Sequence, residues 1–260
     1  MRRFAIAALA ACLVALSATG EVVPLPELGT RLINLPTQLT VGVSTLSVVF
    51  THRFSQTVDD GGGRNLFGLD SAADIGLGAN LGLSPRFDVE LYRSSFFKQW
   101  EGAVKWTVVR QGDAMPLGIG VRVGGAYRSA SGVTDRWTSF AQLVVARRVG
   151  ESLDLFLVPM FASDTPSLRN AGNVGVAAAL HLPRKWDVEA ELIPANRDAR
   201  DGRLAWALGI AKRIPGHEFL LYFGNSRATT ADLLVGSDLP GGFTRGDVRL
   251  GFNLTRRFPE

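Results

Sequence analysis

The last stretch of the chain, residues 247–258, alternates between apolar and polar side chains and closes on an aromatic residue. In an extended strand one face would carry Val248, Leu250, Phe252, Leu254 and Phe258, and the other Asp247, Arg249, Asn253, Thr255 and Arg257. Apolar residues on one side and charges on the other fit a barrel wall between lipid and a polar lumen. The stretch therefore predicts a membrane-spanning β-strand, and it constrains the fold of everything before it.

Read at the same period of two, the chain predicts twelve strands. Their expected bounds are 44–54, 72–83, 86–93, 98–110, 116–128, 137–148, 152–161, 172–182, 186–194, 203–213, 217–225 and 246–258. Short connections with turn-forming residues alternate with longer ones, as in an even-stranded outer-membrane barrel with both termini in the periplasm. We predict an all-β fold: a twelve-stranded antiparallel transmembrane β-barrel in a bacterial outer membrane.

The N-terminus predicts export. Arg2 and Arg3 precede an uncharged apolar run from Phe4 to Ala18, which is typical of a secretory signal and too short for a membrane anchor. Cleavage after Gly20 would divide the chain into a signal peptide (1–20), a periplasmic N-terminal segment (21–39) and the barrel (40–260). A lipoprotein signal ending at Cys12 remains the alternative.

The composition of the chain argues against some classes of function. The net charge is +4, and removal of Arg2 and Arg3 with the signal leaves +2, which gives no support to nucleic-acid binding. The single cysteine would leave with the signal, so thiolate metal sites are not expected. We expect no catalytic residue, cofactor or metal. The expected partners are outer-membrane lipids, small solutes, and the barrel-assembly machinery acting through the C-terminal strand.

Alternation alone does not say which face of the wall meets lipid, because a soluble lipocalin-type barrel has the same period with its apolar face inward. Aromatic residues favour the membrane reading, since they fall near the two ends of the strands on the more apolar face and would form two interfacial girdles. They are Trp100, Trp137 and Trp206 at one end, and Phe87, Trp186, Phe219 and Phe258 at the other. Strand 137–148 stays ambiguous, because Phe140 and Val144 oppose Trp137, Leu143 and Val145.

Several short stretches, taken in order, resemble an uncharacterised family of bacterial outer-membrane β-barrels. They include Arg31 to Pro36, Phe50 to Phe54, Leu66 to Asp70, Arg93 to Phe96, Phe140 to Val149, His217 to Ser226 and Gly246 to Phe258. The resemblance spans nearly the whole mature chain and implies an outer-membrane barrel. The family carries a domain-of-unknown-function label, so the resemblance supplies no catalytic or binding residue.

The predicted strands place a mixed set of charges on the lumen side. The candidate site residues are Asp88, Glu90, Glu101, Lys105, Arg122, Asp187, Glu189, Glu191, Arg249 and Arg257. In an open lumen the acids near the short turns would favour cations. In a closed lumen they would pair with arginines, for example Arg213 with Glu218 and Arg148 with Asp154 across hairpins. Twelve strands do not decide between a narrow channel and a packed structural barrel.

Two other functions stay open. Long loops could make the protein a loop-mediated binding or adhesion protein, and His52 near Ser55 on the lipid side could serve an outer-membrane hydrolase. A hydrolase would require the serine and the histidine to lie within hydrogen-bond distance. We rank catalysis below passage or a structural role, because both residues are equally suited to the rim of a barrel.

Overall fold

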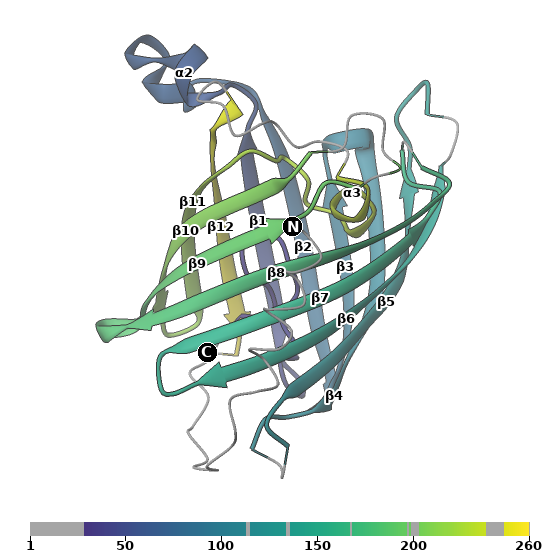
Figure 1. Cartoon of the computed structure of the whole chain (residues 1–260), viewed down its shortest axis with the longest axis vertical. Helices are drawn as coiled ribbons and strands as arrows, with labels where there is room; N and C mark the ends of the chain where they lie inside the picture. Colours follow the sequence, from purple (N-terminus) through teal and green to yellow (C-terminus); the bar gives the residue numbers. More distant parts are fainter. Residues whose placement is uncertain are drawn as a thin grey trace.

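The computed structural model describes residues 29–112, 115–133, 136–166, 168–196, 198, 203–237 and 247–259. These residues form a closed antiparallel barrel in which each strand pairs with the next and β12 pairs with β1 (Figure 1). The strands are β1 (Leu46–Phe54), β2 (Ala73–Ser84), β3 (Phe87–Ser94), β4 (Gln99–Val109), β5 (Gly118–Arg128), β6 (Trp137–Val149), β7 (Leu153–Ser163), β8 (Asn170–Leu182), β9 (Trp186–Ile193), β10 (Ala205–Ile214), β11 (His217–Gly224) and β12 (Arg249–Phe258). The twelve-stranded fold predicted from alternation is confirmed.

The two ends of the barrel differ. The turn end carries the connections 85–86, 110–117, 150–152, 183–185 and 215–216, the fourth of which is the 3₁₀ turn η3 (Pro183–Lys185). The loop end carries α2 (Val58–Gly61), η1 (Gly63–Gly68), η2 (Phe96–Lys98) and α3 (Ala231–Gly236). Helix α2 projects beyond the strands, whereas α3 lies level with them (Figure 1). Within the described residues, no helix has the length and apolar character needed to cross a membrane.

Large apolar side chains cover the outer face of the wall. Exposed examples on eight of the strands are Leu77, Leu91, Val104, Val123, Leu143, Phe161, Leu208 and Leu221. Trp100 and Trp137 are exposed near the loop end, and Trp186, Phe219 and Phe258 are exposed near the turn end. An apolar band between aromatic residues matches a lipid-facing surface, so the outward direction expected for the apolar face holds.

The structure shows which face of β6 points outward, a question that the sequence left open. Trp137 and Leu143 are exposed on the outer face, while Phe140 and Val144 are buried at 4% and 0% exposure. The inward pair belongs to an apolar cluster that also contains residues of α3, and α3 packs against β6, β7 and β8. Phe140 and Val144 therefore point inward because the lumen beside β6 is filled by apolar chain rather than by water.

Residues 29–45, here named the inner hairpin, enter the lumen from the turn end and return to that end before β1 begins. Arg31 pairs with Pro36, and the amide of Leu32 donates to the carbonyl of Leu35 at 2.9 Å. Leu32, Ile33 and Leu35 are each at most 2% exposed. Residues 29–39, the described part of the predicted N-terminal segment (21–39), lie inside the barrel. Residues 1–28, with the predicted signal peptide, lie outside the described residues.

Glycines on the inner face make room for the hairpin. A Cβ atom on Gly120 of β5 would lie 2.8 Å from the Cα atom of Gln38, and one on Gly82 of β2 would lie 1.6 Å from the carbonyl oxygen of Gly42. Both separations are shorter than real Cβ contacts. The wall can therefore accept the returning limb of the hairpin only where it lacks side chains.

The outward direction of β11 can be tested with Leu221, which is 47% exposed and lies in the middle of the strand. We expect Leu221→Arg to lower the free energy of unfolding by about 2 to 4 kcal/mol, because an arginine side chain at the midplane of the bilayer is costly. The measurement is reversible unfolding in lipid vesicles. Leu69→Arg, in the loop beyond η1, is the matched control and should change stability by less than about 1 kcal/mol. Equal effects of the two substitutions would contradict the assigned facing.

Candidate functional site in the barrel lumen

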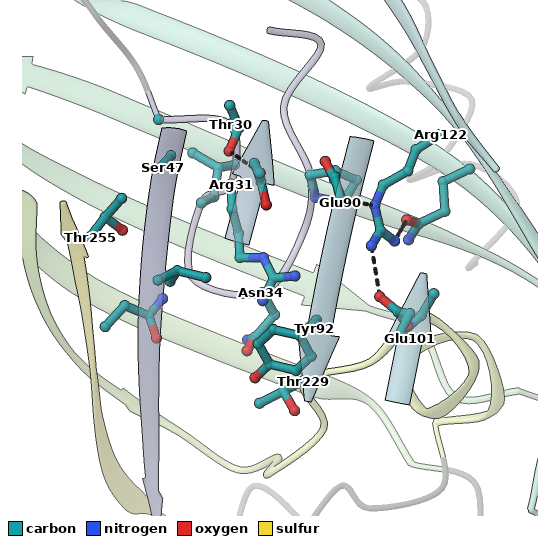
Figure 2. Close-up of a pocket in the computed structure, with 18 of the residues that line it drawn as sticks. Thr30, Arg31, Asn34, Ser47, Glu90, Tyr92, Glu101, Arg122, Thr229 and Thr255 are labelled. Carbon is teal, nitrogen blue, oxygen red and sulfur yellow. Dashed lines mark hydrogen bonds and ion pairs between the residues drawn. The ribbon is translucent and has the colours of Figure 1, made fainter. Parts of the chain in front are cut away.

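Arg122 of β5 is the centre of a buried network on one side of the lumen (Figure 2). Its Nε atom donates to Glu90 Oε2 at 2.6 Å, one terminal nitrogen donates to Glu101 Oε1 at 2.6 Å, and the other donates to Gln142 Oε1 at 2.9 Å. The guanidinium also lies over the ring of Phe140 at 4.8 Å. The strands β3, β4, β5 and β6 are neighbours, and Arg122 lies directly opposite Gln142 of β6. Its long side chain also reaches inward carboxylates on β3 and β4.

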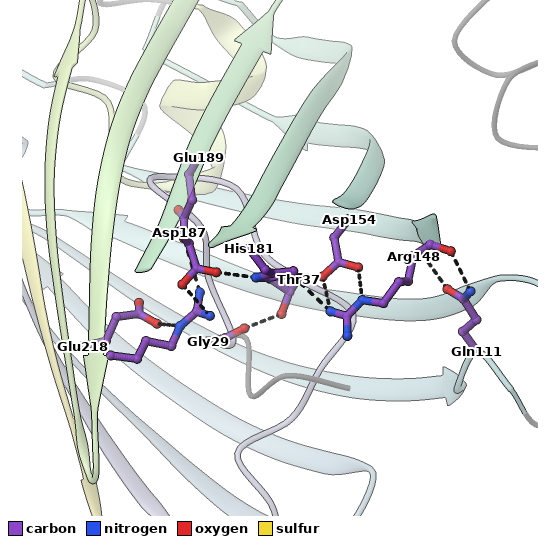
Figure 3. A network of polar contacts seen from close by, with 10 residues as sticks. Gly29, Thr37, Gln111, Arg148, Asp154, His181, Asp187, Glu189 and Glu218 are labelled. Carbon is purple, nitrogen blue, oxygen red and sulfur yellow. Dashed lines mark hydrogen bonds and ion pairs between the residues drawn. The ribbon is translucent and has the colours of Figure 1, made fainter. Parts of the chain in front are cut away.

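A second network lies near the turn end (Figure 3). Arg148 donates through Nε to Asp154 Oδ1 at 2.7 Å, and its terminal nitrogen contacts the other oxygen of the same carboxylate. His181 bridges two acids: its Nε2 lies 2.8 Å from Asp154 Oδ2, and its Nδ1 contacts Asp187. The pair of Arg148 and Asp154 expected across the β6–β7 turn is confirmed.

Arg213 continues this network on β10. Its guanidinium lies 2.7 Å from Asp187 Oδ2 and 3.6 Å from Glu189 Oε1, and its Nε donates to Glu218 Oε2 at 2.8 Å. The expected pair of Arg213 and Glu218 is therefore also confirmed. One guanidinium serves three carboxylates, so this part of the wall is rich in negative charge.

The tip of the inner hairpin is bound by Glu191 of β9. The backbone amides of Asn34 and Leu35 both donate to Glu191 Oε1 at 2.8 Å, and Asn34 Nδ2 donates to Oε2 at 3.1 Å. Glu191 is 3% exposed. Hydrogen bonds from N–H groups to a buried carboxylate are stronger than neutral ones, so Glu191 fixes the depth to which the hairpin enters.

Arg53 of β1 binds the same tip from another part of the wall. One terminal nitrogen donates to Asn253 Oδ1 at 2.7 Å, and the other donates to the carbonyl of Ile33 at 3.2 Å and to Asn34 Oδ1 at 3.0 Å. Asn253 Nδ2 also donates to the carbonyl of Ile33 at 2.9 Å. Side chains from β1, β9 and β12 thus converge on a turn of four residues.

Closer to the turn end, the wall binds the two limbs of the hairpin. The amide of Val41 donates to Asp88 Oδ2 at 2.8 Å, and Lys105 Nζ donates to the carbonyl of Thr30 at 2.6 Å. The Lys105 ammonium also lies 3.9 Å from Glu90. Two of the predicted lumen charges therefore bind the chain's own backbone rather than each other.

All ten predicted site residues lie on the inner face, but the structure does not gather them at one point. Those buried in the networks described above are Asp88, Glu90, Glu101, Lys105, Arg122, Asp187, Glu189 and Glu191. Arg249 and Arg257 are half-buried at opposite ends of β12. Arg249 donates to the carbonyls of Ser55 and Asp247, and Arg257 lines a vestibule at the turn end.

Sequence reasoning missed the attachment of the loop between β11 and β12. Residues 225–237, here named the inner loop, carry α3 into the lumen. Asp232 is fully buried, and its carboxylate accepts hydrogen bonds from Arg128 at 2.5 and 3.1 Å and from Gln99 Nε2 at 2.8 Å. The amide of Ala231 donates to Glu101 Oε2 at 2.8 Å. The apolar run from Leu233 to Val235, unusual for a solvated loop, was the available signal.

A cavity of about 40 Å³ remains in the middle of the lumen (Figure 2). Its lining comes from the hairpin (Arg31, Asn34), the inner loop (Thr229) and the wall (Glu90, Tyr92). This volume holds on the order of three water molecules. A larger vestibule of about 210 Å³ lies at the turn end.

The residues considered for hydrolysis are engaged elsewhere. His52 stacks on Phe252 with ring centroids 4.9 Å apart, and Ser55 Oγ donates to the carbonyl of Ala72 at 2.7 Å. Within the described part of the chain, no group of three or more histidine, cysteine or acidic side chains is arranged to hold a metal ion.

An apolar outer band around a charged interior defines an outer-membrane β-barrel protein. The sequence matches the family described as "Membrane bound beta barrel domain (DUF5777)" over residues 28–258, and the chain belongs to that family. The resemblance noted in the sequence is thereby confirmed. Comparison with curated proteins finds no match.

Three solved structures share the fold. The NanC porin has a TM-score of 0.51 at 8% identity and covers 81% of this chain and 97% of its own. The KdgM porin has a TM-score of 0.51 at 10% identity, with coverage of 81% and 98%. An outer membrane channel from Pseudomonas putida F1 has a TM-score of 0.50 at 12% identity, with coverage of 93% and 100%. At these identities the likeness shows the fold alone.

Hydrogen exchange of the backbone amides tests whether Glu191 holds the hairpin tip in place. We expect Glu191→Ala to lower the protection of the Asn34 and Leu35 amides by at least about tenfold, because two buried N–H groups lose their acceptor. Glu191→Gln retains one acceptor oxygen and should lower it less. Asp88→Ala, which frees only the Val41 amide near the turn end, is the control. Unchanged tip protection in Glu191→Ala would show that the carboxylate does not hold the hairpin.

Proposed function

We propose that the protein is a narrow channel for small solutes that is held closed by its inner hairpin and inner loop. The observation that carries the proposal is that the hairpin fills the lumen without belonging to the wall. It precedes β1, and both of its ends lie at the turn end. Withdrawal of the hairpin would therefore leave the strand pairing of the barrel intact.

The contacts that seat the hairpin also fit a reversible plug. Glu191, Arg53, Asp88 and Lys105 bind it through hydrogen bonds that water could replace on withdrawal. The fold shared with porins is consistent with passage of solutes. The rival function is a structural barrel without passage, in which the same contacts would serve only to fill the interior.

We further propose that the turn end faces the periplasm and that the protein has no catalytic activity. The first strand begins and the last strand ends at the turn end, where Leu46 pairs with Phe258. Outer-membrane barrels place their short turns and termini in the periplasm. The separate engagement of His52 and Ser55 supports a role without catalysis.

Planar-bilayer recording tests the channel. We expect the wild-type protein to conduct little, and deletion of residues 29–41 to increase the steady conductance, because the deletion empties the turn-end half of the lumen and leaves β1 whole. Replacing residues 229–236 with a glycine-serine stretch of equal length should add to the increase. A heat-modifiable gel band confirms folding of each variant. A folded barrel that carries both changes and still conducts nothing would refute passage and leave the structural role.

Removal of the hairpin should also reveal a preference for cations. The deletion takes away the amides that bind Glu191 and Asp88, so both carboxylates would face the open lumen. We expect Glu191→Gln combined with Asp88→Asn to reduce the preference in the deleted barrel, whereas Asp70→Asn in an outer loop should not. Because the screening length falls from about 10 Å at 0.1 M salt to about 3 Å at 1 M, the preference should weaken at high salt. Reversal potentials in a salt gradient measure it, and an anion preference would contradict this assignment.

A further inference from the structure

Helix α3 lies inside the lumen and is enclosed by the barrel wall. All six of its residues are buried. Its side chains Leu233, Leu234 and Val235 share one buried cluster with the inner faces of β6, β7 and β8. The wall side of that cluster contains Phe140, Val144, Phe156, Val158, Met160 and Ala162. Because barrel interiors are usually polar, an apolar inner wall marks a place built for an apolar occupant.

A carboxylate-binding pair of side chains stands beside this apolar wall. Arg128 donates through two nitrogens to one oxygen of Asp232, at 2.5 and 3.1 Å, and Gln99 donates to the other oxygen at 2.8 Å. The side chains of Arg128 and Asp232 are both 0% exposed. Arginine gives proteins directional, charge-assisted recognition of carboxylates. The occupant of the site is thus an apolar body that carries one carboxylate.

The present occupant depends on the wall for its order. A helix of six residues is not stable by itself in water, so α3 is ordered only by its docking. Besides Asp232, the wall holds it through the amide of Ala231 on Glu101 and through the carbonyl of Val235, which accepts hydrogen bonds from Asn173 and Asn196 at 3.2 and 3.3 Å. Because α3 belongs to a loop, it can leave without breaking a strand pair.

We propose that the wall beneath α3 is a binding site for a small apolar carboxylate that competes with α3. In the bound state the ligand carboxylate replaces Asp232 on Arg128 and Gln99, and its hydrocarbon part covers the inner faces of β6 to β8. The inner loop is then displaced from the loop-end half of the lumen. This inference adds to the proposed channel function a class of molecule that would open the lumen. The binding site itself does not depend on the channel function; only the expected increase in conductance does.

Thiol accessibility measures the displacement of α3. Val235 is 0% exposed, so the thiol introduced by Val235→Cys should react slowly with a maleimide while α3 is docked. The full-length protein is placed in phosphatidylcholine nanodiscs, and octanoate is the probe. A ligand that binds only the open form raises its population about tenfold at ten times the dissociation constant. We expect the alkylation rate to rise about tenfold in this way and to follow a hyperbolic dependence on octanoate concentration.

Octan-1-ol and octylamine are the matched ligands, since they share the chain of octanoate but lack its negative charge. Neither should accelerate alkylation in the concentration range where octanoate acts. Acceleration by octanol equal to that by octanoate would overturn the assignment, because it would reflect membrane perturbation or apolar binding alone. No acceleration by octanoate, in protein whose thiol reacts fully after unfolding, would overturn it as well.

Two substitutions in the Val235→Cys background locate the carboxylate. Asp232→Asn removes the internal competitor while keeping its shape, so half-maximal acceleration should occur at a lower octanoate concentration. Arg128→Gln can raise the basal rate by freeing α3, but it should abolish the difference between octanoate and octanol. A difference that survives Arg128→Gln would refute the site. If the folded barrel responds to octanoate but never conducts, the proposed binding site stands and only the proposed channel function is refuted.

Discussion

A closed barrel of twelve strands encloses more space than the side chains of its own wall readily fill, and that space must hold either water or chain. In this protein the inner hairpin and inner loop occupy it, which removes many wall charges from water. A buried carboxylate without a partner is costly, so the occupants must supply donors. Glu191 receives two backbone amides of the hairpin and Asp88 receives another. The hairpin and the charged wall therefore stabilise each other.

The interior contains a charged region and an apolar region. Asp88 and Lys105 represent the charged region, which binds the hairpin, whereas Phe156 and Val158 represent the apolar region, which shares a buried cluster with α3. This division explains why β6 and β7 do not alternate cleanly. Their outer residues meet lipid and part of their inner residues meet apolar chain, so both faces of these strands are apolar. The distribution of apolar residues along each wall strand thus depends on the chain that fills the lumen as well as on the lipid outside.

Sequence alternation predicted all twelve strands because lipid outside and polar groups inside select side chains at every second position. Pairs across short turns, such as Arg213 with Glu218, were also predictable, since the turn fixes the register. Contacts across the lumen were not. Arg128 binds Asp232 at a separation of 104 residues, and Asn34 binds Glu191 at a separation of 157. No local pattern encodes such contacts, because they depend on where the occupants enter a lumen that exists only after closure.

The two occupants come from opposite ends of the barrel and meet in its middle. Leu32 and Leu35 of the hairpin belong to the same buried cluster as Leu233 and Leu234 of α3, and both segments line the central cavity. Each occupant therefore forms part of the surface on which the other rests, so removal of one weakens the seat of the other. Such coupling is reciprocal by thermodynamic necessity. If α3 is displaced as we propose, its departure would lower the free energy needed to withdraw the hairpin at the turn end, so the two ends of the lumen would be coupled.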